Sequence, residues 1–155
     1  MNNFFNANIN ASLIESKQTY GQVETNLRTL ALRDGETLTG SRQLQGQSPY
    51  LINASLDFNN QNGTRAGLYF NMQGKTLEVV GAGYNPDIYT HPFESLNFTF
   101  SKSFGQESKK SINLKVENIL GSKRESYAES FRSIDQIYTF RDPGLKFSLG
   151  YSINL

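Results

Sequence analysis

Apolar and polar residues alternate along much of this chain, and this alternation constrains its fold more than any other feature. In the first segment Phe5, Ala7 and Ile9 fall on one face of an extended chain, and the asparagines between them fall on the other. A period of two is typical of β-strands, whereas an amphipathic helix repeats every 3.6 residues. The same period recurs in six segments, at residues 5–13, 50–58, 66–72, 95–101, 111–117 and 145–155. The sequence therefore predicts an all-β fold built from about six strands.

The connections between these segments are short and long in turn. Short polar turns lie at residues 59–64 and 104–110, and the first contains an Asn-Gly pair, which is typical of tight hairpins. Long polar stretches lie at about residues 20–47, 81–92 and 119–142. Outer-membrane barrels have short periplasmic turns and long extracellular loops. We therefore expect antiparallel, up-and-down strands of a transmembrane β-barrel, with both chain ends in the periplasm.

Aromatic residues lie near the ends of the predicted strands. Phe5, Phe58 and Phe104 fall at the strand ends that we expect to be periplasmic. Tyr50 and Phe93 fall at the ends that lead to long loops. Transmembrane barrels carry belts of aromatic side chains at both interfaces, where amphipathic rings are favoured. These residues are therefore candidates for an inner and an outer aromatic belt.

The composition excludes several classes of protein. The mean hydropathy is -0.51 and 37% of residues are hydrophobic, which excludes a helical membrane protein but not a barrel, because barrel strands alternate in polarity. The net charge of +1 is spread without a basic stripe, so nucleic acid is not an expected partner. The absence of cysteine excludes disulfides and thiolate metal sites. The N-terminus has no signal-peptide pattern, so we expect an export signal upstream of Met1.

A second fold is compatible with the same alternation. In a soluble β-sandwich, one face of each sheet packs on the other sheet and the second face meets water. The periodicity alone does not separate a sandwich, acting as a binding or adhesion module, from a barrel. The alternation of short and long connections and the large size of the apolar side chains favour the membrane barrel.

Four motifs after residue 41 resemble one family. Residues 42–56, Arg-Gln-Leu-Gln-Gly-Gln-Ser-Pro-Tyr-Leu-Ile-Asn-Ala-Ser-Leu, are similar to a motif near the C-terminus of TonB-dependent receptors, especially those of Bacteroidetes-type bacteria. The other motifs follow in the family's order and are Asn-Pro-Asp-Ile-Tyr at 85–89 with Ser-Leu-Asn-Phe at 95–98, Lys-Val-Glu-Asn-Ile-Leu at 115–120, and Asp-Pro-Gly-Leu-Lys-Phe-Ser-Leu-Gly at 142–150.

The resemblance implies an outer-membrane receptor that takes up a scarce ligand, such as a siderophore, vitamin, glycan or peptide. It implies a barrel of about 22 strands, of which residues 1–155 supply roughly the last six, with the plug domain absent from this chain. The implied partners are outer-membrane lipid, the remainder of the barrel, the plug, and the TonB complex acting indirectly through that plug. In the family, ligand binds to extracellular loops and to the plug apex.

The end of the chain also resembles an assembly signal. Ser148, Gly150, Ile153 and Leu155 fit a polar-x-Gly-x-x-apolar-x-apolar pattern that the barrel assembly machinery recognises in many outer-membrane proteins. Unpaired backbone groups of a last strand can add to the edge of another sheet. We therefore expect these residues to contact the assembly machinery.

No residue pattern predicts an enzyme, a cofactor or a metal. His91 is the only histidine, and we expect a loop residue without a catalytic role. Inward polar residues such as Asn53, Asp57 and Lys115 are expected to form a hydrated wall. The stretch 119–142 mixes cationic and aromatic side chains suited to an anionic or aromatic ligand, and its candidate ligand contacts are Arg124, Tyr127, Phe131, Arg132, Tyr138 and Arg141.

Overall fold

The computed structural model describes residues 4–60, 62–105 and 109–153. Within these ranges the chain forms twelve strands and one helix, and every paired strand is antiparallel, so the fold is all-β as predicted. In chain order the elements are β1 (Phe4–Leu13), β2 (Gln18–Thr19), α1 (Gln22–Leu30), β3 (Ser41–Arg42), β4 (Tyr50–Asn59), β5 (Thr64–Gln73), β6 (Thr76–Val79), β7 (Asp87–Thr90), β8 (Phe93–Phe104), β9 (Lys110–Glu117), β10 (Arg124–Glu129), β11 (Gln136–Arg141) and β12 (Lys146–Ile153).

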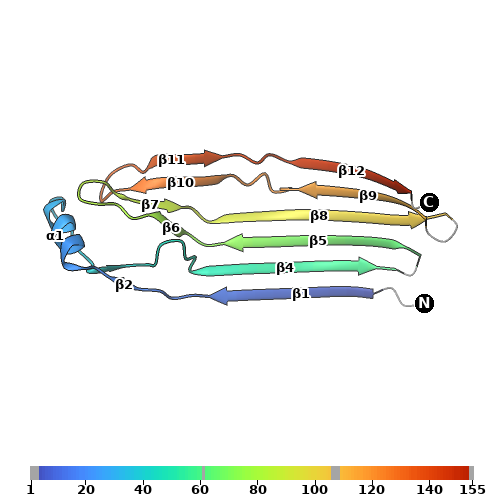
Figure 1. The fold of residues 1–155 in the computed structure, drawn as a ribbon, viewed down its shortest axis with the longest axis horizontal. Helices are drawn as coiled ribbons and strands as arrows, with labels where there is room; N and C mark the ends of the chain where they lie inside the picture. Colours follow the sequence, from blue (N-terminus) through green and yellow to red (C-terminus); the bar gives the residue numbers. More distant parts are fainter. Residues whose placement is uncertain (1–3, 61, 106–108, 154–155) are drawn as a thin grey trace.

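The six predicted strands are all present and form a single sheet. Its order, β1-β4-β5-β8-β9-β12, follows the chain, so the sheet is the up-and-down meander that the connection lengths predicted. Figure 1 shows both ends of the chain and the short connections at one end of this sheet, with the long connections at the other. Predictions that involve Gln61, residues 106–108 or Leu155 fall outside the described residues.

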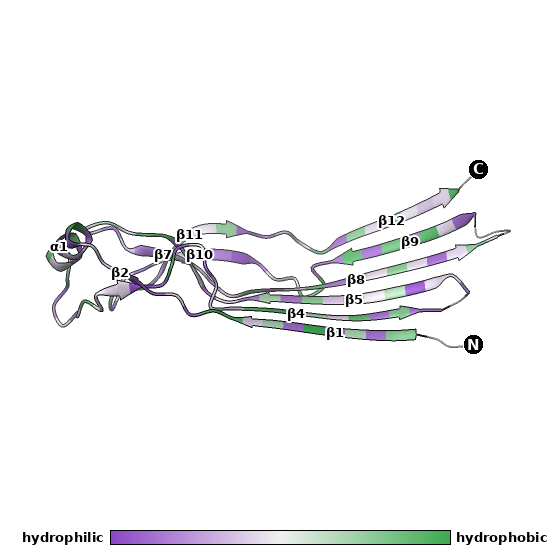
Figure 2. Ribbon diagram, turned by 60° about the horizontal axis from the view of Figure 1, so that its bottom comes forward, coloured by the Kyte–Doolittle hydropathy of each residue, from purple (hydrophilic) through white to green (hydrophobic). Residues whose placement is uncertain are grey.

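The pairing register brings the apolar positions of all six strands onto one face. Residues directly opposite each other in an antiparallel pair point to the same face of the sheet. Two complete rows contain no charged or polar side chain, and they are Phe5-Phe58-Ala66-Phe100-Leu114-Leu149 and Ala7-Leu56-Leu68-Phe98-Val116-Phe147. This face is exposed, with Phe147 at 69% and Leu149 at 78%. Figure 2 shows the resulting bands of hydrophobic and hydrophilic residues along the strands.

Charged and aromatic residues lie at the ends of this apolar face. Glu94 lies opposite Met72 at the end that leads to the long connections. Lys102 lies at the other end, where its Nζ donates a 2.8 Å hydrogen bond to Thr64 Oγ1. The charged groups therefore flank the apolar rows and leave them uninterrupted.

The inner aromatic residues pair across the strands, but one outer residue was placed on the wrong face. The rings of Phe5 and Phe58 lie 4.9 Å apart at the short-turn end of the sheet. Phe93 lies opposite Gln73, and it shares the polar face because odd-numbered residues of β8 point there. The Cζ atom of Arg124 lies 5.9 Å from the centre of its ring. The prediction that Phe93 belongs to an outer belt on the apolar face is therefore wrong.

The opposite face of the six-stranded sheet is polar and carries its own hydrogen bonds. Tyr69 donates a 2.6 Å hydrogen bond from its hydroxyl to Asp57 Oδ1 on the neighbouring strand. Its ring covers Gly67, where an added Cβ atom would lie 2.4 Å from the Tyr69 hydroxyl. This arrangement requires a glycine at the position opposite Asp57.

A second sheet continues the first one lengthwise. It has four strands in the order β11-β10-β7-β6, and both views show it beyond the end of β5, β8, β9 and β12 (Figures 1 and 2). Leu77 and Ile88 belong to it, and they are the buried hydrophobic residues of the described chain. The segment before β4 pairs along its edge, because Gly46 N donates to Leu77 O at 2.8 Å.

The long connections contain more regular structure than their polar composition predicted. The stretch 20–47 includes α1 and β3, and the stretch 119–142 includes β10 and β11. Val23, Leu27 and Leu30 recur at helical spacing along α1, and this spacing is a sequence signal for the helix. No helix in the described ranges is long and apolar enough to cross a membrane.

Neither large sheet closes on itself within the described residues, so what the structure establishes is an antiparallel all-β architecture. That class is shared by the barrel and by the sandwich alternative. The edges of the six-stranded sheet are β1 and β12, the first and the last strand.

Candidate functional site

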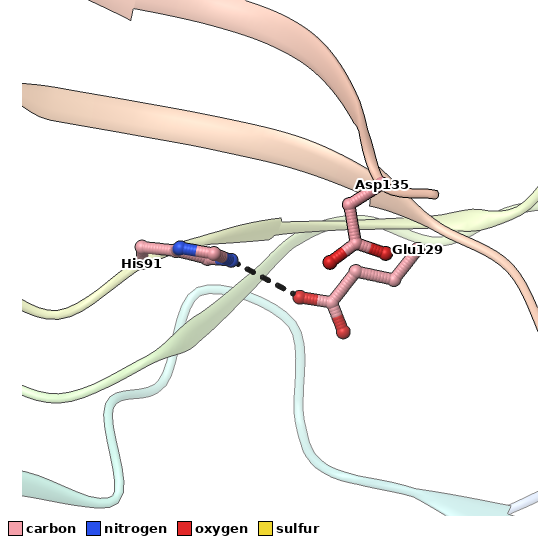
Figure 3. A group of neighbouring side chains, drawn as sticks. All are labelled: His91, Glu129 and Asp135. Atoms are coloured by element: carbon pink, nitrogen blue, oxygen red, sulfur yellow. Dashed lines mark hydrogen bonds and ion pairs between the residues drawn. The ribbon is translucent and has the colours of Figure 1, made fainter. Parts of the chain in front are cut away.

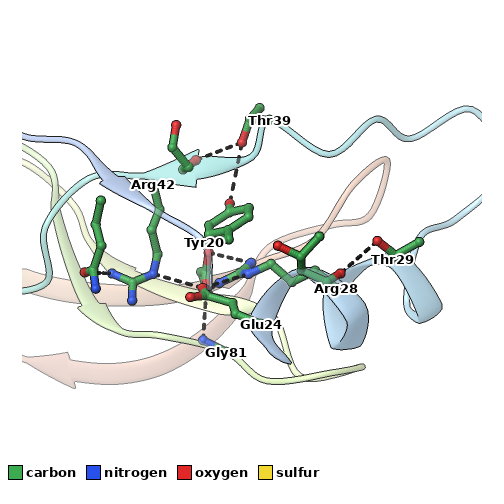
Figure 4. Close-up of polar contacts among 11 residues, drawn as sticks. Tyr20, Glu24, Arg28, Thr29, Thr39, Arg42 and Gly81 are labelled. Atoms are coloured by element: carbon green, nitrogen blue, oxygen red, sulfur yellow. Dashed lines mark hydrogen bonds and ion pairs between the residues drawn. The ribbon is translucent and has the colours of Figure 1, made fainter. Parts of the chain in front are cut away.

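Helix α1 is fixed to the second sheet by a network of charged groups (Figure 4). Arg28 binds both carboxylate oxygens of Asp87, with its Nη2 at 2.8 Å from Oδ1 and its Nη1 at 3.2 Å from Oδ2. Glu24 Oε1 accepts hydrogen bonds from Arg28 and from Arg42, each at 3.1 Å. Gly81 N donates to Asp87 Oδ1 at 2.7 Å. Asp87 therefore joins the helix, β7 and the 81–86 turn.

Four hydroxyl side chains lie in one row across the second sheet. Thr76, Thr90, Ser126 and Thr139 are directly opposite one another on β6, β7, β10 and β11. Thr139 Oγ1 donates to Ser126 Oγ at 2.8 Å, and Ser126 in turn donates to Glu78. Thr90 Oγ1 also donates to Glu78 Oε2 at 2.8 Å. Thr90 and Ser126 therefore donate directly to one carboxylate, whereas Thr76 Oγ1 donates to Gly74 O at 3.1 Å.

Glu78 is held in its ionised form by this row. The hydrogen bonds from Ser126 and Thr90 lower the pKa of Glu78 below its ordinary value, and the positive charge of Arg124 lowers it further. Burial acts in the opposite direction and is outweighed. Glu78 Oε2 therefore accepts two hydrogen bonds from its own sheet.

Two arginines lie directly opposite each other at the end of β10 and β11. Like charges in opposed positions of an antiparallel pair repel each other. Arg124 and Arg141 nevertheless occupy such positions, and neither forms an ion pair with any described residue. They border a pocket of about 490 Å³, which we call the arginine pocket, and its lining residues are Gly46, Gln73, Thr76, Glu78, Thr90, Arg124, Ser126, Thr139 and Arg141.

The arginine pocket contains only two of the six predicted ligand contacts. Tyr127 lies on the opposite face of β10, where its ring stacks on His91. Phe131 and Arg132 lie in the β10–β11 turn, with the Arg132 Cζ atom 5.0 Å from the centre of the Phe131 ring. Tyr138 lies at the register shift of the β10–β11 pair and is 54% exposed. The structure therefore distributes the six residues over four places.

The sequence did not predict the other residues of the arginine pocket. Thr76 and Glu78 belong to a four-residue strand that alternates polar and apolar residues, which is too short to stand out. Their partners Thr90, Ser126 and Thr139 lie in other connections, far away in the sequence. Only the pairing of β6, β7, β10 and β11 brings the hydroxyl groups together.

The polar face of the six-stranded sheet forms a larger and shallower hollow of about 780 Å³. Asp57 and Lys115, two of the residues expected in a hydrated wall, line it together with Tyr69 and Arg65. These side chains carry both signs of charge, so the hollow has no single preference for anions or cations.

The assembly-signal residues lie on β12, at the edge of the six-stranded sheet. Ser148 and Gly150 point to the polar face, opposite Lys115 and Asn113, and Ile153 lies opposite Lys110. All three are exposed. Leu155 lies outside the described residues.

Comparison of the chain with models of protein families, with curated proteins and with solved structures finds no match. A functional proposal therefore depends on the chain's own residues, their geometry and the motifs described above.

Proposed function

We propose that this chain is the C-terminal part of the barrel wall of a TonB-dependent outer-membrane receptor. The observation that carries the proposal is the apolar face, in which two rows of six apolar residues cross the sheet without a polar interruption. An apolar face of this size needs either a second protein layer or lipid. The second sheet lies beyond the end of the first and leaves this face uncovered (Figures 1 and 2).

The arrangement of the ends supports the same proposal. Short turns and both described chain ends lie at one end of the sheet, which would be periplasmic, and the second sheet with α1 would be extracellular (Figure 1). The strand edges of β1 and β12 would pair with the rest of a barrel of about 22 strands, because lipid cannot satisfy exposed backbone groups. The assembly machinery would engage β12 through Ser148, Gly150, Ile153 and Leu155.

The identity of the receptor family is supported by the ordered motifs between residues 42 and 150. Within this proposal the arginine pocket would hold an anionic group of the transported ligand. Arg124 and Arg141 form no ion pair with a described carboxylate, although the charge of Arg124 acts on Glu78 in the same pocket. Their guanidinium groups provide the planar, bidentate hydrogen-bond donors that carboxylate, phosphate and sulfate groups bind.

The lipid contact can be tested because the chain contains no cysteine. Single cysteines placed from Arg65 to Met72, leaving out Gly67, and labelled with an environment-sensitive dye are compared in vesicles that contain brominated lipid. Quenching by the lipid should follow a period of two, strong at residues 66, 68 and 70 and weak at 65, 69 and 71. A chain that folds without lipid and shows no alternating quenching would support the sandwich alternative and overturn the proposal.

Ligand uptake tests the receptor itself. Cells that carry Arg124→Gln together with Arg141→Gln should take up the ligand at least tenfold less well at low concentration. Lys17→Gln serves as the control, since Lys17 is exposed and has no described partner. Unchanged uptake with the double variant would remove the arginine pocket from the ligand path, and unchanged growth after deletion of the gene under ligand limitation would count against the receptor.

A further inference from the structure

Three potential metal ligands meet on the other face of the second sheet (Figure 3). His91 follows β7, Glu129 ends β10, and Asp135 precedes β11. One ligand atom from each residue lies within 4.8 Å of the others. His91 Nε2 and Glu129 Oε1 are already 3.3 Å apart. We propose that His91, Glu129 and Asp135 bind a divalent transition-metal ion of the zinc class.

The surrounding residues orient two of these ligands. The His91 ring stacks on Tyr127, with 4.3 Å between the ring centres and 27° between the planes. Its backbone N–H donates to Glu125 O at 2.9 Å. Lys75 binds Glu129 Oε2 and thereby leaves Oε1 directed at His91. Because these contacts already restrict the two side chains, metal binding costs less conformational entropy.

The third ligand is available for a cation. Asp135 is exposed and has no hydrogen bond or ion pair with another described residue. Two carboxylates compensate the charge of a divalent ion, and Lys75, with its side chain 41% exposed, is partly screened by water. Glu129 and Asp135 border a pocket of about 480 Å³, so an ion can enter from solvent.

The ligand set and the distances favour zinc over magnesium or calcium. Zinc binds imidazole nitrogen and carboxylate oxygen at about 2.0 to 2.2 Å, which places neighbouring ligands of a tetrahedral site roughly 3.3 to 3.6 Å apart. The pair of His91 and Glu129 already has this separation. Asp135 needs to move closer by about 1 Å, and it lies just outside β11. Magnesium and calcium prefer sites made of oxygen alone.

A bound ion would join the β10–β11 turn to β7 with an open coordination position for water or ligand. The same turn also accepts a hydrogen bond from Arg33 Nη1 to Phe131 O at 2.9 Å, which links it to the segment after α1. The metal would therefore fasten the connections at this end of the molecule to one another. This inference does not depend on membrane insertion or on transport.

Calorimetric titration of the purified, detergent-solubilised chain with zinc chloride tests the site. We expect one ion per chain with a dissociation constant in the micromolar range or below. His91→Gln, Glu129→Gln and Asp135→Asn should each weaken binding at least tenfold. Glu125→Gln is the matched control on the same strand, because its carboxylate binds the Tyr127 hydroxyl and lies outside the triad.

The single histidine permits a second measurement. Nuclear magnetic resonance of the imidazole nitrogens follows one residue, and zinc should shift the Nε2 signal of His91 to the range of metal-bound imidazole. Circular dichroism establishes that each variant is folded. Asp135→Asn changes an exposed residue outside the Lys75–Glu129 ion pair, so this variant tests the metal site without breaking that pair. The absence of saturable binding up to millimolar zinc would overturn the proposal. Binding that is lost with His91 but unchanged in both carboxylate variants would overturn it equally.

Discussion

Tyr69 on β5 donates a hydrogen bond from its hydroxyl group to Asp57 Oδ1 on the neighbouring strand β4, with 2.6 Å between the two oxygen atoms. The ring lies over Gly67, so the side chain uses the space that a Cβ atom would fill. The absence of a side chain at position 67 therefore permits a contact between two other residues on the polar face.

Gly67→Ala should displace Tyr69 and weaken its hydrogen bond with Asp57. We expect a loss of about 1 kcal/mol in the free energy of unfolding, measured by denaturant titration in detergent. In a Tyr69→Ala background the same change should cost nothing or stabilise slightly, because glycine is unfavourable inside a strand. Equal losses in both backgrounds would contradict the steric explanation.

Leu114→Arg tests the apolar face. Leu114 lies between Phe100 and Leu149 in one of the two apolar rows. A charge at this position should lower the stability of the chain in lipid vesicles by roughly 2 to 4 kcal/mol if the face meets the bilayer. Asn113→Arg is the control, because Asn113 points to the polar face and should tolerate arginine. A similar cost at both positions would argue against lipid contact.

Glu78 should make stability depend on acid pH. Its pKa is lowered from the ordinary value of 4.5 by Ser126 and Thr90, so the folded state favours the ionised carboxylate. This contribution is complete above pH 4.5 and disappears as the pH falls through the lower pKa of the folded state. The stability difference between the wild type and Glu78→Gln should therefore shrink below pH 4.5. Thermal unfolding over this range measures it, with the exposed Glu15→Gln variant as control.

Asp87→Ala should release α1 from the second sheet. The change removes both hydrogen bonds from Arg28 and the one from Gly81 N. We expect a loss of about 2 kcal/mol, given that hydrogen bonds to partly buried charged groups are the stronger ones. Limited proteolysis should then cleave faster between β2 and β3 than in the wild type. Asp34→Ala, at an exposed carboxylate in the same connection, should leave the cleavage rate unchanged.

The six long strands were predictable because their sequence carries the period of two over eight to twelve residues. The meander followed from the lengths of the connections. The prediction for Phe93 was wrong because it relied on the size of the aromatic ring. Phe93 is the first residue of β8, and its position in the alternation places it on the polar face.

The second sheet was less accessible to sequence reasoning. Its strands have four to six residues, and no local pattern indicates that Thr90 pairs with both Thr76 and Ser126. Asn118 illustrates the same difficulty. The motif that contains it was recognised by resemblance, but its positive φ of 56° and the hydrogen bonds from its amide group to Ser122 O and Gly144 O depend on the folded turn.

The strict alternation of the six-stranded sheet also divides the residues into two sets that can change independently. In β5, substitutions at Arg65, Tyr69 or Asn71 alter only the polar face, whereas Leu68 and Phe70 contribute only to the apolar one. In the proposed receptor, residues of the polar face could therefore change with a new ligand while residues of the apolar face stay the same. Such a fold would separate the mutations that alter ligand specificity from those that alter the contact with the surroundings.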